Sequence, residues 1–126
     1  MSHYTSVKTK IYEDATLIEV LKEMGYEVSY ETNMNNSWGG NRRVNFQIVI
    51  PNSDNIGFVR KAGERNFSMV VDWFGVKGVS RREFLPKVMR EYSKRIVYRQ
   101  ARAMGYRVEQ HVNKKDNSIR MVLRKR

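Results

Sequence analysis

The amino-acid sequence predicts an α+β fold in a single domain over residues 1–126, with elements in the order βαββββαββ. Two observations predict this class. Seven segments alternate in apolar character as strands do, and two other segments have the apolar spacing of helices. The connections between successive middle strands are short enough for hairpins, which favour antiparallel pairing. We therefore expect a mainly antiparallel sheet with two helices packed on one face.

The first strand and the first helix are predicted near the N-terminus. Residues 7–11 alternate with lysines, the period of a half-buried strand. Asp14 can cap the helix that follows, whose apolar residues recur at helical spacing over 17–24. Gly25 is suited to end this helix, because glycine readily adopts the left-handed conformation found just after a helix. Residues 27–30 then alternate as a second strand.

Three further strands are predicted in the middle of the chain, at residues 44–48, 56–60 and 67–74. Clusters of turn-forming residues separate them. Residues 32–42, which precede them, are rich in Asn and Gly and have no apolar period. We expect a long loop over this segment.

A second helix and a C-terminal hairpin complete the prediction. Ser80–Glu83 has the S-x-x-E pattern of a capping box, and the apolar stripe that follows runs to Met104. Pro86 lacks the backbone donor that a helix interior needs, so we expect a short first turn with the regular helix beginning at or near it. Strands are predicted at 106–112 and 118–124, with a polar turn between them.

Positive charge is concentrated in the second part of the chain. The protein has a net charge of +11 and a pI near 10.1. Residues 1–79 contain nine Lys/Arg and nine Asp/Glu, whereas residues 80–126 contain fifteen and four. Such an asymmetry is typical of proteins that bind a polyanion, and a merely solvated surface is the alternative.

Basic residues of the second helix, the hairpin and the long loop are the candidates for contacting nucleic acid or another polyanion. Lysine and arginine can neutralise phosphates, and arginine can also stack on exposed bases. The candidates are Arg42, Arg43, Lys87, Arg90, Lys94, Arg95, Arg99, Arg102, Lys114, Lys115, Arg124, Lys125 and Arg126. The chain shows no helix-turn-helix, zinc-finger or RNA-recognition signature, so we expect electrostatic binding with little sequence specificity.

Two aromatic residues are candidates for contacting a partner. Trp38 lies in the Gly-rich loop, where it can stack on a base or fill a pocket of a partner protein. The alternative is a flexible hairpin tip with Trp38 folded back onto the sheet. Tyr98 lies among the basic residues of the second helix. The loop also lacks the Lys-Ser/Thr ending of a phosphate-binding P-loop.

The residue inventory argues against catalysis and metal binding. Cysteine is absent, which removes disulfides, thiolate chemistry and most structural zinc sites, and the two histidines, His3 and His111, are far apart in the sequence. Asp72 stands before bulky apolar residues, and no second catalytic group pairs with it. A structural role is therefore the favoured interpretation, with acid-base chemistry as the alternative. We expect no enzyme activity, no cofactor and no metal.

The location expected from the sequence is a cytoplasmic type of compartment. No apolar run approaches the roughly 18 residues of a membrane helix. Residues 1–4 lead directly into the first strand, so no signal peptide and no membrane contact are expected.

Nearly the whole chain resembles a family of proteins without an assigned activity. The resemblance is carried by the segments Met1–Tyr4, Lys8–Lys10, Met24–Val28, Asn55–Phe58, Val71–Gly75, Glu91–Tyr92 and Ser118–Leu123. The family is the hypothetical chloroplast reading frame thirty-five group of cyanobacteria, algal plastid genomes and some cyanophages. Its pattern usually has Asp where this chain has Asn55, and Trp where it has Phe74.

The resemblance implies a location in the cyanobacterial cytoplasm or plastid stroma, or a phage-encoded variant, but no particular activity. Two functional hypotheses remain open. One is a non-enzymatic accessory protein that binds nucleic acid through its basic residues. The other is an interaction module that docks on an acidic protein surface, with Trp38 as an anchor. Their salt dependence distinguishes them, because phosphate binding weakens steeply as salt rises.

Overall fold

The computed structural model of the protein describes residues 3–125. Within them it has two α-helices, α1 (Asp14–Glu23) and α2 (Phe84–Ala103), and a mainly antiparallel sheet, which confirms the predicted α+β class. The chain divides into two compact units, the first ending at Tyr92 and the second beginning at Ser93. In the described part of the chain, no helix is long and apolar enough to cross a membrane.

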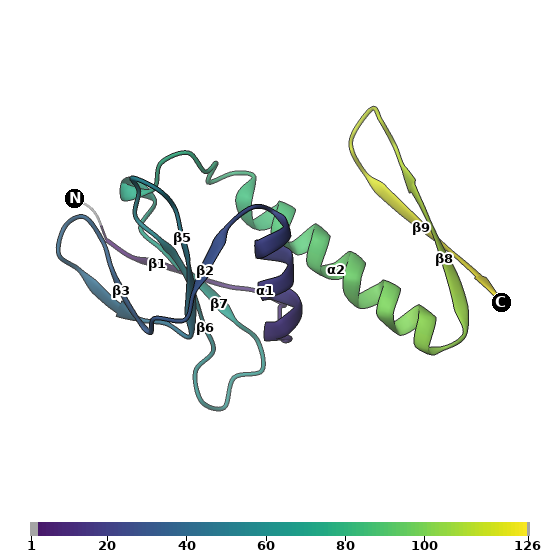
Figure 1. Ribbon diagram of the computed structural model, residues 1–126, viewed down its shortest axis with the longest axis horizontal. Coiled ribbons are helices and arrows are strands. Elements are labelled where there is room, and N and C mark those ends of the chain that lie inside the picture. Colours follow the sequence, from purple (N-terminus) through teal and green to yellow (C-terminus); the bar gives the residue numbers. More distant parts are fainter. Residues whose placement is uncertain (1–2, 126) are drawn as a thin grey trace. The chain divides into compact units, whose positions relative to one another are not determined.

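A five-stranded antiparallel sheet is the centre of the first unit, with its strands in the order β1-β7-β6-β5-β2 (Figure 1). The strands are β1 (Thr5–Lys8), β2 (Glu27–Ser29), β5 (Phe46–Val49), β6 (Ile56–Val59) and β7 (Ser68–Val71). Short turns join β5, β6 and β7 in succession, which makes them antiparallel neighbours as predicted. Strands β1 and β2 form the two edges of the sheet.

Different elements cover the two faces of this sheet. Phe46 and Phe58 lie opposite each other on β5 and β6, and their rings stack with centroids 5.5 Å apart. Val70 points to the other face, because neighbouring residues of a strand alternate in direction, and it packs there against Met34. Figure 1 shows α1 and the ribbon that contains β3 on opposite sides of the sheet.

The first part of α2 packs beside α1. The Tyr92 hydroxyl accepts hydrogen bonds from the backbone N–H groups of Tyr12 and Glu13, at 3.2 and 3.0 Å, just before α1 begins. The ring of Phe84 meets that of Tyr26, just after α1 ends, edge-on at 5.7 Å. Contacts at both ends of α1 thus place α1 and the first part of α2 on the same face, as the sequence predicted.

The ends of α1 agree with the prediction only in part. Gly25 has a φ of +94° and follows the helix, as predicted, and the Tyr26 N–H donates to the Leu21 carbonyl at 3.1 Å. The predicted cap at Asp14 was wrong. Glu13 occupies the N-cap position without a side-chain capping bond, and Asp14 is the first helical residue. An acidic residue there still interacts favourably with the helix dipole.

The start of α2 accommodates its proline as expected. The Glu83 N–H donates to the Ser80 Oγ at 3.3 Å, which is one half of the predicted capping box. Pro86 is the third residue of α2. It therefore lies in the first turn, where backbone N–H groups have no partner within the helix and the missing donor costs little.

The prediction of an irregular loop over residues 32–42 was wrong, because this segment forms a second small sheet. Strand β3 (Asn33–Asn35) pairs antiparallel with β4 (Asn41–Arg43). Met34, in the middle of β3, is fully buried against Val70 of the main sheet. Strands of three residues are too short to show an alternating pattern in sequence, so the element order gains two strands that periodicity could not reveal.

The strand predicted at 67–74 is shorter than expected. A 3₁₀ turn, η1 (Trp73–Gly75), replaces its last part. The cause is Asp72, whose side chain accepts a hydrogen bond from the Phe74 N–H at 3.2 Å and so caps the turn. This difference decides which way the Phe74 ring faces.

The second unit contains the C-terminal part of α2 and the predicted hairpin. Strand β8 (Tyr106–Val112) pairs antiparallel with β9 (Ile119–Lys125) along its whole length. The Asn117 N–H closes the turn on the Asn113 carbonyl at 2.8 Å, and Asn117 has a φ of 58°, a conformation that asparagine tolerates. The hairpin prediction is therefore confirmed to within one residue at each strand end.

Candidate functional site

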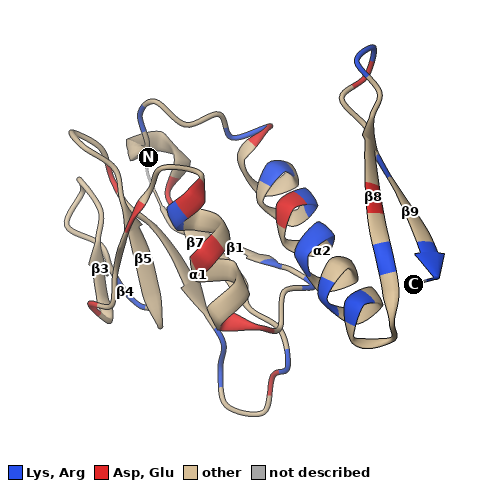
Figure 2. Ribbon diagram, turned by 45° about the vertical axis from the view of Figure 1, so that its right-hand side comes forward, with Lys and Arg blue, Asp and Glu red and all other residues tan. Residues whose placement is uncertain are grey.

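The charge of the protein belongs almost entirely to the second unit. Residues 93–126 contain eleven Lys/Arg and two Asp/Glu, a net charge of +9, whereas residues 1–92 contain thirteen and eleven, a net charge of +2. Figure 2 shows the lysines and arginines along α2 and both strands of the hairpin. A net charge of this size on so short a segment produces a strongly positive local potential.

The predicted polyanion-contacting residues are split between the units. Arg42, Arg43, Lys87 and Arg90 belong to the first unit, and the others up to residue 125 belong to the second. Arg126 lies outside the described residues. Most are exposed, except Arg42, Lys94 and Arg95, which are half-buried.

Tyr98 lies on the exposed side of α2, as a residue that contacts a partner must. Its side chain is 42% exposed. The guanidinium carbon of Arg102 lies 5.6 Å from the centre of its ring, one helical turn further on. The two side chains therefore form one cationic and aromatic surface on the C-terminal part of α2.

One face of the hairpin is charged and the other is apolar. The register places Arg107, Glu109 and His111 on the face that also carries Arg120 and Arg124 of β9. The opposite face is mainly apolar and carries Tyr106, Val108, Val112, Ile119, Met121 and Leu123, together with Gln110 and Lys125. A two-stranded sheet buries little surface by itself, so this apolar face is only partly covered.

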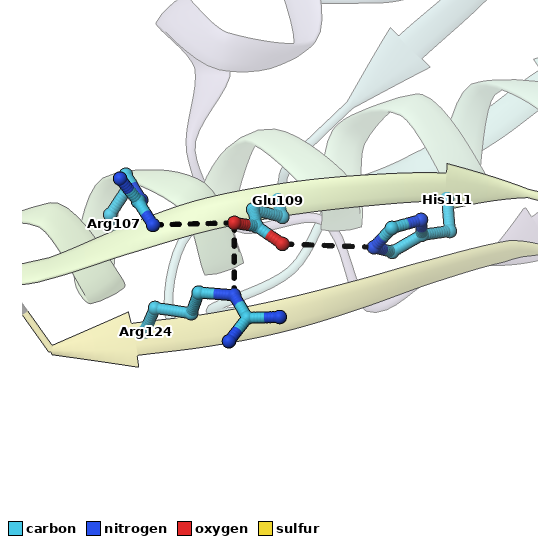
Figure 3. Close-up of polar contacts among 4 residues, drawn as sticks. All are labelled: Arg107, Glu109, His111 and Arg124. Carbon is cyan, nitrogen blue, oxygen red and sulfur yellow. Dashed lines mark hydrogen bonds and ion pairs between the residues drawn. The ribbon is translucent and has the colours of Figure 1, made fainter.

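Glu109 is the acidic centre of the charged face (Figure 3). Its carboxylate lies 2.9 Å from Arg124 Nε and 3.4 Å from Arg107 Nη2, and His111 Nε2 is 3.8 Å away. The hydrogen bond from Arg124 is the main cause that holds the pKa of Glu109 below its usual value, and the charge of Arg107 adds to it. Glu109 therefore stays ionised and neutralises part of this face. Lys114 and Lys115, in the hairpin turn, take no part in these ion pairs with Glu109.

A second candidate surface lies in the first unit, at the turn between β3 and β4. Trp38 is 65% exposed at this turn, so it does not fold back onto the sheet. Its ring contacts that of Phe74 in η1, with centroids 6.0 Å apart and planes tilted by 55°. Phe74 is itself 70% exposed. We call Trp38 and Phe74 the aromatic pair.

The aromatic pair stands on a buried hydrogen-bond network. The Asn36 Oδ1 accepts from the backbone N–H groups of Trp38 and Gly40, at 3.2 and 2.6 Å. The Asn36 Nδ2 donates to Asp72 at 2.8 Å, and Asp72 in turn accepts from the Phe74 N–H. One amide and one carboxylate, 9% and 2% exposed, thus connect the two segments that carry the rings. Asp72 has the structural role favoured from the sequence.

Asp54 holds the same turn from a third segment. Its carboxylate accepts from the Ser37 Oγ at 2.5 Å and from the Ser37 N–H at 3.1 Å. Its backbone N–H donates to the Gly75 carbonyl at 3.0 Å. A Cβ on Gly75 would lie only 1.8 Å from Asp54 Oδ2, so the network requires glycine at this position. The turn is therefore bonded to two other segments of the chain, through Asp54 and Asp72.

Tyr4 is bonded to β3, close enough to this network to be affected by the charges of its two carboxylates. Its hydroxyl donates to the Met34 carbonyl at 3.1 Å. Burial, followed by the negative charges of Asp54 and Asp72, raises the pKa of Tyr4 to about 12, against the opposing effect of Arg42. The guanidinium carbon of Arg42 lies 5.9 Å from the Tyr4 ring. Tyr4 therefore remains a hydrogen-bond donor at neutral pH.

Sequence reasoning found Trp38 but missed Phe74. The only sequence signal for Phe74 was that it is a bulky apolar residue, next to a glycine, on the second face of a predicted strand. The pairing of Phe74 with Trp38 depends on a hydrogen bond between residues 36 positions apart, which no local pattern reveals. In the described part of the chain, no group of three or more His, Cys, Asp or Glu residues is placed to hold a metal ion.

These features define a small α+β protein in which a nearly neutral sheet unit bears an exposed aromatic pair and a helix-hairpin unit bears the positive charge. The chain belongs to the family described as "Protein of unknown function (DUF1257)", whose sequence model matches residues 20–122. The expected membership of a family of unknown function is thereby confirmed. No curated protein matches the chain, and no solved structure matches it either.

Proposed function

We propose that this protein is a non-enzymatic accessory protein that binds nucleic acid through its basic second unit, with little sequence specificity. The observation that carries this proposal is the net charge of +9 on residues 93–126. Lysines and arginines that contact phosphates release the counterions condensed on nucleic acid, and this release supplies most of the affinity of non-specific binding. The sequence has no helix-turn-helix, zinc-finger or RNA-recognition signature, which is why we propose little specificity.

A second candidate function is docking on an acidic protein surface. The observation that favours it is the apolar face of the hairpin, where Val112 and Leu123 remain 53% and 49% exposed. Apolar residues beside many cations fit a partner that is acidic and partly apolar. Docking of this kind depends less on salt than phosphate binding does, because burial of apolar surface is not screened.

Fluorescence anisotropy of labelled single-stranded RNA and duplex DNA tests the first proposal, over salt from about 50 to about 200 mM. We expect binding that weakens steeply as salt rises. In the variant Lys114→Glu/Lys115→Glu/Arg120→Glu, removal of three phosphate contacts should lower the magnitude of the salt slope on duplex DNA by about 2.7. All three side chains are exposed, so the variant should fold.

The matched control is Lys8→Glu/Lys10→Glu/Lys61→Glu in the first unit, where the three lysines are also exposed. It changes the net charge by the same amount but leaves the second unit intact. Equal weakening in both variants would show that only overall charge matters. No binding near physiological salt would refute the proposal and leave docking on an acidic protein as the stronger candidate.

We also propose, from the sequence resemblance, that the chain comes from the cyanobacterial, plastid and cyanophage group of its family. A cytoplasmic type of compartment follows from this assignment. Fractionation of cells that express the protein, with antibody detection, tests the location.

A further inference from the structure

We propose that the aromatic pair, Trp38 and Phe74, is a stacking site for the bases of single-stranded nucleic acid. This inference rests on the proposed function and adds the form of nucleic acid that the protein prefers. Every base has a flat apolar face that stacks on aromatic side chains, and such stacking is largely independent of sequence.

Both side chains of the pair are largely exposed to solvent. Trp38 and Phe74 are 65% and 70% exposed, although large apolar side chains normally become buried when the chain folds. Among the residues that the structure describes, the two rings contact each other, with centroids 6.0 Å apart, and no other aromatic ring. Because both large rings are exposed to solvent, a ligand can contact them.

The pair is also held in place before any ligand binds. Asn36 and Asp72 fix the backbones of both rings, and Asp54 fixes the residue that precedes Trp38. A ligand that stacks here therefore loses little binding free energy to ordering of the protein.

The size of the apolar surface favours a base over a protein partner. Among the described residues of the first unit, the large apolar side chains that are exposed are Tyr30, Trp38 and Phe74. A typical protein interface buries about 800 Å² on each partner, far more than two side chains provide. One or two bases match a pair of rings.

The charges around the pair are compatible with a polyanion. The two nearby carboxylates, Asp54 and Asp72, are 9% and 2% exposed and are turned toward backbone and side-chain donors. The turn itself, residues 36–40, contains no charged residue. The protein as a whole has a net charge of +11, so a negatively charged strand is attracted and its neutral bases can reach the rings.

Duplex nucleic acid cannot use this site, because its base faces are buried within the stack. The test compares labelled single strands of roughly 12 nucleotides, of RNA and of DNA, with a duplex of the same length. The variants are Trp38→Ala, Phe74→Ala and the double variant, and Tyr30→Ala is the matched control. Tyr30 is 60% exposed in the same unit, and the Trp38–Phe74 contact does not involve it.

We expect the double variant to bind single strands about tenfold more weakly, with duplex binding and the Tyr30→Ala control unchanged. In a Trp73→Phe background, where Trp38 is the one remaining tryptophan, its emission should be quenched by single strands but not by duplex. Both rings are exposed, so urea unfolding curves should show that the variants remain folded.

If the double variant bound single strands as tightly as the wild type does, this inference would be overturned, and the pair would be left as an anchor for a protein segment. Equal losses for single strands and duplex would also overturn it. Duplex binding by the wild-type protein tests the proposed function separately, because duplex does not offer base faces. One pair of results would uphold the proposed function and refute the stacking site. In it, the variant Lys114→Glu/Lys115→Glu/Arg120→Glu loses duplex binding, while the aromatic variants bind single strands as the wild type does.

Discussion

Replacement of Gly75 by alanine should disrupt the support of the aromatic pair. A Cβ at this position would lie 1.8 Å from Asp54 Oδ2 and 2.5 Å from Asp54 Cγ. Real Cβ atoms are essentially never closer than 3.0 Å to such atoms, so the carboxylate must move by about 1.2 Å. It has little freedom to do so, because the Asp54 backbone N–H is bonded to the Gly75 carbonyl at 3.0 Å.

The size of the effect follows from what this movement breaks. Overpacking typically costs about 1–3 kcal/mol, and hydrogen bonds to a charged group contribute about 1.5–3 kcal/mol each. Asp54 accepts two hydrogen bonds from Ser37. At the edge of the turn, water can replace part of the stabilisation that these two hydrogen bonds contribute. We therefore expect Gly75→Ala to lower the free energy of unfolding by about 3 kcal/mol.

The assay is urea unfolding followed by circular dichroism, with Gly63→Ala as the control. Gly63 has a φ of +84° and open space around its Cβ position, so alanine there should cost only about 1 kcal/mol of backbone strain. A Gly75→Ala protein as stable as the Gly63→Ala protein would refute the argument. It would show that the Asp54 carboxylate can move without loss, and that the turn beneath Trp38 is not rigid.

Two further predictions concern the first unit. Tyr92→Phe removes the acceptor of the Tyr12 and Glu13 backbone N–H groups, and should lower the free energy of unfolding by about 1–3 kcal/mol in urea titrations. Tyr26→Phe, whose ring lies in a comparable helix contact, should cost less than this. Because the pKa of Tyr4 is raised from 10.0 to about 12, the unfolded chain loses this proton first, so stability should fall as pH rises between these values. Tyr4→Phe should flatten this part of the curve of unfolding free energy against pH, and an unchanged curve would contradict the assignment.

Several elements were predictable because neighbouring residues determine them. Gly25 ends α1 through its own φ of +94°, and the polar turn at 113–117 closes the β8–β9 hairpin. The capping bond at Ser80 and the position of Pro86 in the first turn of α2 are equally local. In each case the interacting groups are a few residues apart, so the sequence pattern and the structure carry the same information.

The second small sheet and the aromatic pair were not predictable in this way. Strands β3 and β4 form because Met34 is buried against Val70, a contact made across 36 positions of the chain. The Asn-rich sequence of this segment indicates a loop, but tertiary packing outweighs that weak preference.

By itself, the sequence determined the α+β class, the hairpin and the concentration of positive charge in residues 80–126, because periodicity and charge are properties of the chain. The tertiary structure alone decided that Trp38 faces water, that Phe74 stands beside it, and that Asp72 is bonded to Asn36. The physical reason is that Asn36, Asp54 and Asp72 exchange hydrogen bonds with segments far away in sequence. Such bonds form only once the sheet has brought those segments together.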